Sequence, residues 1–188
     1  MPIKKCLAAL TVSSLICFLV LGLRTQAAGR ENAAQGTPVT KAIGQLIPTT
    51  KTQSTVKGTV TFTKTSSGIH VHGEISGLTP GEHGFHVHEF GVWNEDGMAS
   101  GGHFNPTGAP HASHSSEKRH VGDMGNIKAD ENGNATVDLD DDQMTFEGST
   151  SILGRGLVVH AKADDLKTQP SGDAGGRLAV AIVGVAKP

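Results

Sequence analysis

The stretch GFHVHEFGVW, residues 84–93, alternates apolar and histidine side chains. In a β-strand, residues two apart project from the same face, so the apolar side chains face one way while His86 and His88 face the other. Two such histidines lie roughly 7 Å apart at the backbone, which suits two imidazoles that bind one metal ion. The same triplet recurs in GIHVHGE at residues 68–74. The triplet therefore predicts strands but does not decide which pair binds a metal.

A long loop follows the strand of His86 and His88, and it contains further candidate ligands. These are His103, His111, His120 and Asp123. Three imidazoles and a carboxylate suit tetrahedral zinc, whereas a site made only of imidazoles suits copper or zinc. With His160 later in the chain, seven candidate ligands serve two metals, which leaves room for one shared histidine. The alternative is a histidine-rich loop in contact with solvent.

His70 and His72 have no comparable set of ligands beside them. Alternation points both histidine pairs away from the apolar face, so it cannot separate one pair from the other. We expect His70 and His72 to be exposed surface side chains, with a weak adventitious metal site as the alternative.

Short alternating runs between turn residues continue along the chain. TVKGTVTFTK, NATVDLD and RLAVAIVGVA resemble strands, DENGN marks a turn, and no stretch shows a long helical period. Seven or eight short strands without helices predict an all-β, antiparallel sandwich or flattened barrel. Residues 91–119 and 161–176 do not fit strands, and loops of this length in a compact domain are usually functional or disordered.

The N-terminus has the layout of a secretory signal peptide over residues 1–27. Two lysines precede an apolar stretch, and small residues surround a cleavage position after Ala27. The alternative is an uncleaved membrane anchor. We expect a flexible leader over residues 28–40 and one domain over residues 41–188. This interpretation implies an extracytoplasmic location, periplasmic or secreted, with no membrane contact after cleavage.

Removing residues 1–27 would change both the charge and the thiol content. The full chain has 16 basic and 18 acidic residues, a net charge of −2. Three of the basic residues lie in the removed segment, which leaves 13 against 18 and a net charge of −5. Such an acidic chain argues against nucleic acid as a partner. Cys6 and Cys17 also lie in this segment, so the exported chain would contain no disulfide.

Five separated segments resemble, in order and spacing, the signature motifs of the Cu/Zn superoxide dismutases. They are GFHVHEFG, GGHFNP, RHVGDMGNI, GRGLVVHAKADD and GDAGGRLA, and the resemblance covers about residues 40–188. It implies an eight-stranded antiparallel Greek-key β-barrel with two long functional loops over a metal site. It also implies an enzyme that converts superoxide to dioxygen and hydrogen peroxide. The alternative function is an extracytoplasmic metal-buffering or copper-delivery protein of the same fold.

The resemblance assigns the ligands residue by residue. It implies copper ligands at His86, His88, His103 and His160. It implies zinc ligands at His103, His111, His120 and Asp123, with His103 bridging the two ions and taking part in catalysis. Asp164 matches a carboxylate that accepts hydrogen bonds from two of these histidines, His86 and His111. Arg177 matches the active-site arginine, whose positive charge attracts superoxide beside the copper.

Five further residues receive weaker expectations. His114 has no role in the family and is expected in an exposed loop, whereas His83 is expected to be structural, hydrogen-bonded under the loops. Asp165 is expected to be a solvated loop charge. Lys162 and Lys167 would extend the attraction of superoxide along the rim of the site.

The cysteine pair that joins the first long loop to the last strand in the family is absent. We interpret the matching positions as Met98 and Val180. Trp93 is expected either to pack under the loop, replacing the covalent link together with a contact of Met98 on Val180, or to lie partly exposed on a dimer surface. The segments SILGRG and IVGVA resemble the apolar dimer patch of eukaryotic members, which favours a homodimer.

Overall fold

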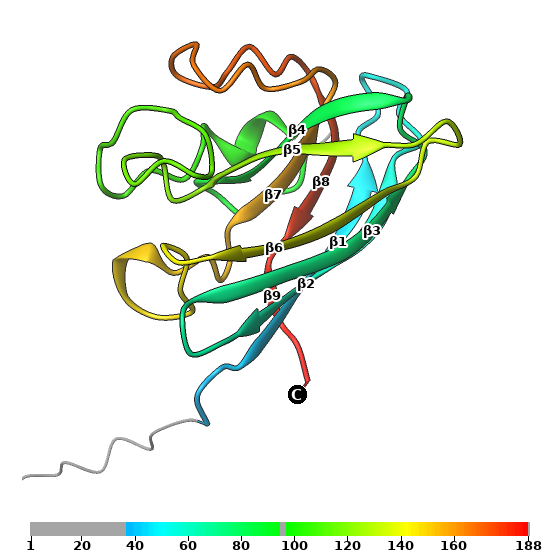
Figure 1. Cartoon of the computed structure of the whole chain (residues 1–188). Coiled ribbons are helices and arrows are strands. Elements are labelled where there is room, and N and C mark those ends of the chain that lie inside the picture. The colour runs from blue at the N-terminus through cyan, green and yellow to red at the C-terminus, as the bar shows by residue number, and fades with distance from the viewer. Residues whose placement is uncertain (1–36, 95–96, 188) are drawn as a thin grey trace, which may run out of the picture. The chain divides into compact units, whose positions relative to one another are not determined.

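The computed structural model describes residues 37–94 and 97–187, and this part of the chain is built from β-strands (Figure 1). The predicted signal peptide and most of the predicted leader lie outside the described residues. The strands are β1 (Lys41–Pro48), β2 (Lys57–Lys64), β3 (Ile69–Ser76), β4 (Gly81–His88), β5 (Asp123–Ala129), β6 (Ala135–Asp141), β7 (Gly156–His160), β8 (Arg177–Ile182) and β9 (Gly184–Val185). Two short 3₁₀ helices, η1 (Met98–Ser100) and η2 (Gly148–Thr150), lie between strands. In the described residues, no helix has the length and apolar character that a membrane crossing requires.

The side-chain alternation in β3 shows why such segments form strands. Ile69 and Val71 point into the core, whereas His70 and His72 lie on the opposite, solvent-facing side. Residues with this period and branched side chains favour a pleated strand that is buried on one face. β4 differs, because its residues 83–88 are buried on both faces. Protein covers the outer face of β4, and this cover is the physical difference between the two His-Val-His triplets.

The strands form one antiparallel sheet that curls into a nearly closed barrel. Their order is β5-β4-β7-β8-β1-β2-β3-β6. The end strands β5 and β6 lie beside each other without a hydrogen-bonded ladder. The pairs β3–β6 and β4–β7 join strands that are not consecutive, as in a Greek key. The predicted all-β Greek-key barrel is confirmed, and the two-residue strand β9, which pairs with β1, is an addition to the expected eight strands.

The barrel encloses an apolar core and begins slightly before the predicted domain boundary. Phe62 of β2 and Phe85 of β4 are completely buried in this core. Val39 packs against the same core, and the carbonyl oxygen of Thr40 accepts a hydrogen bond from the backbone N–H of Lys64 at 2.9 Å. The last residues of the predicted flexible leader are therefore part of the folded barrel.

Two long loops leave the barrel (Figure 1), and a side chain of one loop bonds the backbone of the other. Residues 89–122 connect β4 to β5, and residues 161–176 connect β7 to β8. Gln169 of the second loop accepts a hydrogen bond from the backbone N–H of His111 at 2.8 Å and donates one to its carbonyl oxygen at 2.8 Å. This pair of hydrogen bonds fixes the second loop to the middle of the first.

The residue of the first loop that lies against Val180 of β8 is Gly97, so the interpretation of Met98 was wrong. Met98 is 62% exposed. Gly97 has φ 67°, a left-handed conformation that glycine adopts readily. A Cβ atom added to Gly97 would lie 3.7 Å from the Cβ atom of Val180. A close approach of the loop backbone to β8 therefore replaces the expected contact of Met98 with Val180.

We expect a disulfide to form in the variant Gly97→Cys/Val180→Cys. The separation of 3.7 Å is close to the Cβ–Cβ distance of about 3.8 Å found in disulfides. A bond that closes a loop of about 80 residues contributes about 4.5 kcal/mol in the chain-entropy model. The oxidised variant should therefore melt about 10 °C above the reduced variant at equal metal content, as measured by calorimetry.

A cysteine in a left-handed conformation destabilises the folded state. Both redox states of the variant carry this cost, so it cancels in the difference between their melting temperatures. Two thiols that stay free under mild oxidation, in protein with native circular dichroism, would contradict the placement of Gly97 beside Val180.

Candidate metal centre

Six histidines and one aspartate converge at the covered face of β4. They form two groups that share His103. The first group is His86, His88, His103 and His160, and the second is His103, His111, His120 and Asp123. All seven residues are at most 5% exposed. In each group, one possible ligand atom per residue lies within 4.8 Å of those of the other residues. The structure thus brings together every residue that the sequence analysis proposed as a ligand.

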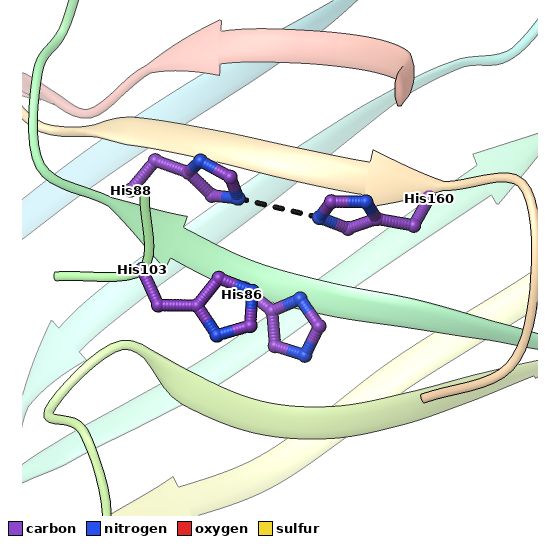
Figure 2. Close-up of side chains that lie close together, drawn as sticks. All are labelled: His86, His88, His103 and His160. Atoms are coloured by element: carbon purple, nitrogen blue, oxygen red, sulfur yellow. Dashed lines mark hydrogen bonds between the residues drawn. The ribbon is translucent and has the colours of Figure 1, made fainter. Parts of the chain in front are cut away.

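Irregular strand pairing aims these side chains. The ladder between β4 and β5 shifts register between Gly84 and His86, and the ladder between β7 and β8 shifts just before His160. Such a shift re-aims a side chain relative to a regular strand. His103 belongs to the first loop and pairs with His88 in an isolated antiparallel bridge. Figure 2 shows the result: the rings of His88 and His160 face each other, and those of His86 and His103 lie beside them.

His88 and His160 present two bare ring nitrogens to each other. Nδ1 of His88 donates to the carbonyl oxygen of Gly101 at 3.0 Å, and Nδ1 of His160 donates to that of Gly175 at 3.2 Å. Burial, with the neighbouring imidazoles, holds the pKa of both rings well below its usual value, so both are neutral. Each Nε2 therefore carries a lone pair, and these two atoms lie only 3.2 Å apart (Figure 2). Two facing lone pairs repel unless a cation binds both.

His86 and His103 each have one buried ring nitrogen without a partner. Nε2 of His86 donates to Asp164 at 2.8 Å, and Nδ1 of His103 lies 2.7 Å from Asp123. The opposite nitrogens, Nδ1 of His86 and Nε2 of His103, find no hydrogen-bond partner in the described part of the chain. Burial lowers the pKa of His86, and it lowers the pKa of His103 to about 4. Buried lone pairs of this kind are costly unless an ion binds them.

The carboxylate of Asp123 lies at the centre of the second group. Its Oδ1 is 2.7, 3.0 and 3.3 Å from Nδ1 of His103, His111 and His120. Burial alone would raise the pKa of Asp123, but the three imidazoles outweigh it and hold the pKa well below its usual value. Burial alone would lower the pKa of His111, but its contacts with Asp123 and Asp164 raise it to about 9. The second group therefore favours positive charge, supplied by a proton or by a metal ion.

Asp164 of the second loop connects the two groups. Its Oδ2 accepts a hydrogen bond from Nε2 of His86 at 2.8 Å, and its Oδ1 accepts one from Nε2 of His111 at 2.9 Å. These are the two hydrogen bonds that the family resemblance implied. Asn126 of β5 holds Asp164 in turn, because it donates to the Asp164 carbonyl oxygen at 2.8 Å and accepts from its N–H at 2.7 Å. The only sequence signal for Asn126 is its place in the motif RHVGDMGNI.

Arg119 is a buried cation that the sequence analysis missed. Its Nε donates to the carbonyl oxygen of His114 at 2.9 Å and its NH1 to that of His120 at 3.2 Å. Its NH2 pairs with Asp141 at the end of β6 at 2.9 Å, so the buried charge is compensated. His114 is only 28% exposed and lies 3.2 Å from Asp141, so the expectation of an exposed loop residue was wrong. Together these contacts fix the loop next to His120.

Arg177 presents a positive charge beside the first group. A pocket of about 400 Å³ opens there, and its wall includes His88, His103, His120, His160 and Arg177. The guanidinium donates to the carbonyl oxygens of Gly97 and Gly101 and, at 2.9 Å, to the hydroxyl of Ser100. These acceptors carry no formal charge, so the positive charge of Arg177 remains available to an anion in the pocket.

Other residues singled out in the sequence lie outside the two groups. His83 is buried, and its ring nitrogens lie 2.8 Å from the carbonyl oxygen of His160 and 2.9 Å from that of Thr79, which fits the structural role expected for it. His70 and His72 lie on the outer face of β3. The exposed lysines of the second loop do not line the pocket, and Lys162 pairs with an exposed aspartate at 3.5 Å.

Comparison with known proteins agrees with the fold. A sequence model of the family described as copper/zinc superoxide dismutase (SODC) matches residues 56–183, more than half of the chain. The crystal structure of the clock protein EA4 is similar, with a TM-score of 0.73 and 41% sequence identity. That similarity covers 80% of this chain and 98% of the other. Both buried groups lie within the matched residues, and the chain therefore belongs to the copper/zinc superoxide dismutase family.

Proposed function

We propose that this protein is a superoxide dismutase, which converts two superoxide anions and two protons to dioxygen and hydrogen peroxide. Copper would bind to His86, His88, His103 and His160, and zinc to His103, His111, His120 and Asp123. The observation that carries the proposal is the set of buried imidazole nitrogens that have no hydrogen-bond donor facing them. The rings of His88, His103 and His160 line a pocket that also presents Arg177. Membership of the family supports the choice of copper and zinc.

His103 is the residue that we assign to proton transfer. When bound, copper supplies the one-electron oxidation and reduction of superoxide, and zinc supplies a fixed positive charge. His103 belongs to both groups: its Nδ1 lies 2.7 Å from Asp123, whereas its Nε2 is unpartnered. Nε2 can therefore take up a proton and donate it to the peroxide that forms. The adjacent Asp123 stabilises the ring while it is protonated.

Arg177 is the residue that we assign to binding of the superoxide anion. The full chain has a net charge of −2, so an anion needs a local positive site to reach the pocket. Burial lowers the pKa of Arg177, yet a guanidinium stays protonated at neutral pH. The hydrogen bonds to Gly97, Ser100 and Gly101 hold this charge at the pocket wall.

A second candidate function is a metal-binding protein of the same fold without dismutase activity. The observation that favours it is the similarity to a protein described as a clock protein. Both candidates use the two buried groups, so metal content does not separate them. A superoxide assay on protein loaded with copper and zinc separates the two candidates, because full metal content without activity would support the second.

Exposed apolar side chains support the proposed homodimer. They are Phe90, Val92, Trp93, Ile182 and Val185, which are 42% to 64% exposed. The backbone of Gly91 lies against Ile182 and Gly154, so the start of the first loop, the end of β8 and the segment SILGRG share this surface. Trp93 thus fits the interpretation as a partly exposed surface residue. An apolar surface of this kind favours association with another protein surface.

Replacing Ile182 with Asp should convert the homodimer to a monomer, because the carboxylate would have to be buried at the interface without a partner. Sedimentation at several protein concentrations measures the mass. A parent protein that is already a monomer, or an Ile182→Asp variant that keeps the dimer mass, would exclude this surface.

Replacing Arg177 with Ile should lower the rate with superoxide about tenfold or more at low ionic strength. Copper and zinc contents should stay unchanged, because Arg177 is in neither ligand group. The parent rate should fall with added salt, since charge attraction is screened over about 10 Å at 0.1 M. Lys57→Gln removes the same charge from an exposed position on β2 and serves as the control. Equal rates with superoxide for the Arg177 and Lys57 variants would contradict the role of Arg177 in binding the anion.

Zinc should stabilise the first loop as well as the whole domain. An ion present at one hundred times its Kd stabilises the folded state by about 2.7 kcal/mol, which corresponds to a rise in Tm of about 5–10 °C. Amide hydrogen exchange in residues 97–122 should slow at the same time. The variant His120→Ala should lose most of both effects, whereas His114→Gln, which removes a histidine outside the ligand group, should keep them. A Tm that does not respond to zinc in the parent would contradict the second group as a zinc site.

A further inference from the structure

The outer face of β3 and β6 carries a second set of metal-binding side chains. His70 and His72 point outward from β3, and in the antiparallel register they lie opposite Asp140 and Asp138 of β6. The two histidine side chains are 36% and 52% exposed. This set is separate from the two buried groups, because it lies on the solvent-facing side of the sheet. Two imidazoles and two carboxylates therefore meet at an open surface.

The geometry of this set resembles that of a built metal site. Nδ1 of His70 donates to Asp140 at 2.9 Å, which fixes the tautomer and leaves Nε2 with a lone pair. That Nε2 lies 3.9 Å from one oxygen of Asp138, and Nδ1 of His72 lies 3.8 Å from the other. The two rings are nearly parallel, with an interplanar angle of 8°. One possible ligand atom from each of His70, His72 and Asp138 lies within 4.8 Å of the other two.

We propose that His70, His72 and Asp138 bind a divalent transition-metal ion, with Asp140 as a positioning residue for His70. A carboxylate that holds the far nitrogen of a ligating histidine is the usual support of such a ligand. Two imidazoles and one carboxylate suit Cu(II) or Zn(II), with Cu(II) bound more tightly, and do not suit Mg(II). Because the site is exposed, its ion exchanges with solvent more readily than an ion in the buried groups.

The charges on this face favour the same conclusion. Within the described residues, the ion pairs of Asp138 and Asp140 are made with these two histidines. Two carboxylates two residues apart on one strand repel each other, and a bound dication removes this repulsion. Glu74 also lies on this face, but it accepts hydrogen bonds from Thr136 and is not in the ligand set. Glu74 therefore provides a matched control, a nearby carboxylate of the same charge.

The test begins with full-length protein whose buried groups have been filled with zinc and whose excess ions have been removed. Equilibrium dialysis against Cu(II), Zn(II) and Mg(II) then counts the ions bound beyond those in the buried groups. We expect one further Cu(II) or Zn(II) per chain and no Mg(II). With substoichiometric Cu(II), paramagnetic broadening should be strongest for the amide signals of residues 69–73 and 137–141. The outcome does not depend on dismutase activity, so this proposal and the proposed function can fail separately.

Variants then separate a ligand set from a surface that is merely negative. The double variant His70→Gln/His72→Gln should lose the additional ion. Asp140→Asn should weaken its binding about 10- to 100-fold, as expected for the partner of a ligating histidine. Glu74→Gln should leave binding nearly unchanged. The proposal is overturned if the parent binds no additional ion, if the double variant still binds it, or if the Asp140 and Glu74 variants weaken binding equally.

Discussion

The arrangement of the candidate metal centre depends on one buried carboxylate, that of Asp123. Its Oδ1 faces the ring nitrogens of His103, His111 and His120. Its Oδ2 accepts hydrogen bonds from the backbone N–H groups of Ala112 and His120, both at 3.1 Å. Asp123 thus fixes both the side chains and the backbone of the loop. A buried anion needs this much compensation to remain charged, and the surrounding imidazoles provide it.

The second loop adds its own constraints to the same centre. Asp164 fixes the rings of His86 and His111, while Gln169 binds the backbone of His111. Arg177 then binds the first loop through carbonyl oxygens. Each loop is therefore held in place by polar groups of the other loop or of a strand. Together these contacts hold the candidate ligand side chains close to one another.

The sequence predicted the barrel and the identity of the clustered residues better than it predicted how the loops are fixed. Alternation located both histidine pairs, but it could not distinguish His86 from His70. The two differ in whether loops distant in sequence bury the outer face of the strand, which a local pattern does not show. The placement of Met98 was wrong by one residue, because the backbone of Gly97 lies against Val180 of β8, and a residue without a side chain gives no sequence signal for such a contact. Arg119 was missed because its partner lies 22 residues away on another element, and no local pattern links the two.

Gly97 and Val180 lie against each other without a covalent bond, and this has a consequence for how the molecule matures. Both cysteines of the chain lie in its first 17 residues, so the barrel contains no thiol for an oxidant or a disulfide isomerase to act on. Chain collapse after synthesis therefore needs no intervening redox step. Maturation of the barrel is independent of whether the surrounding medium is reducing or oxidising.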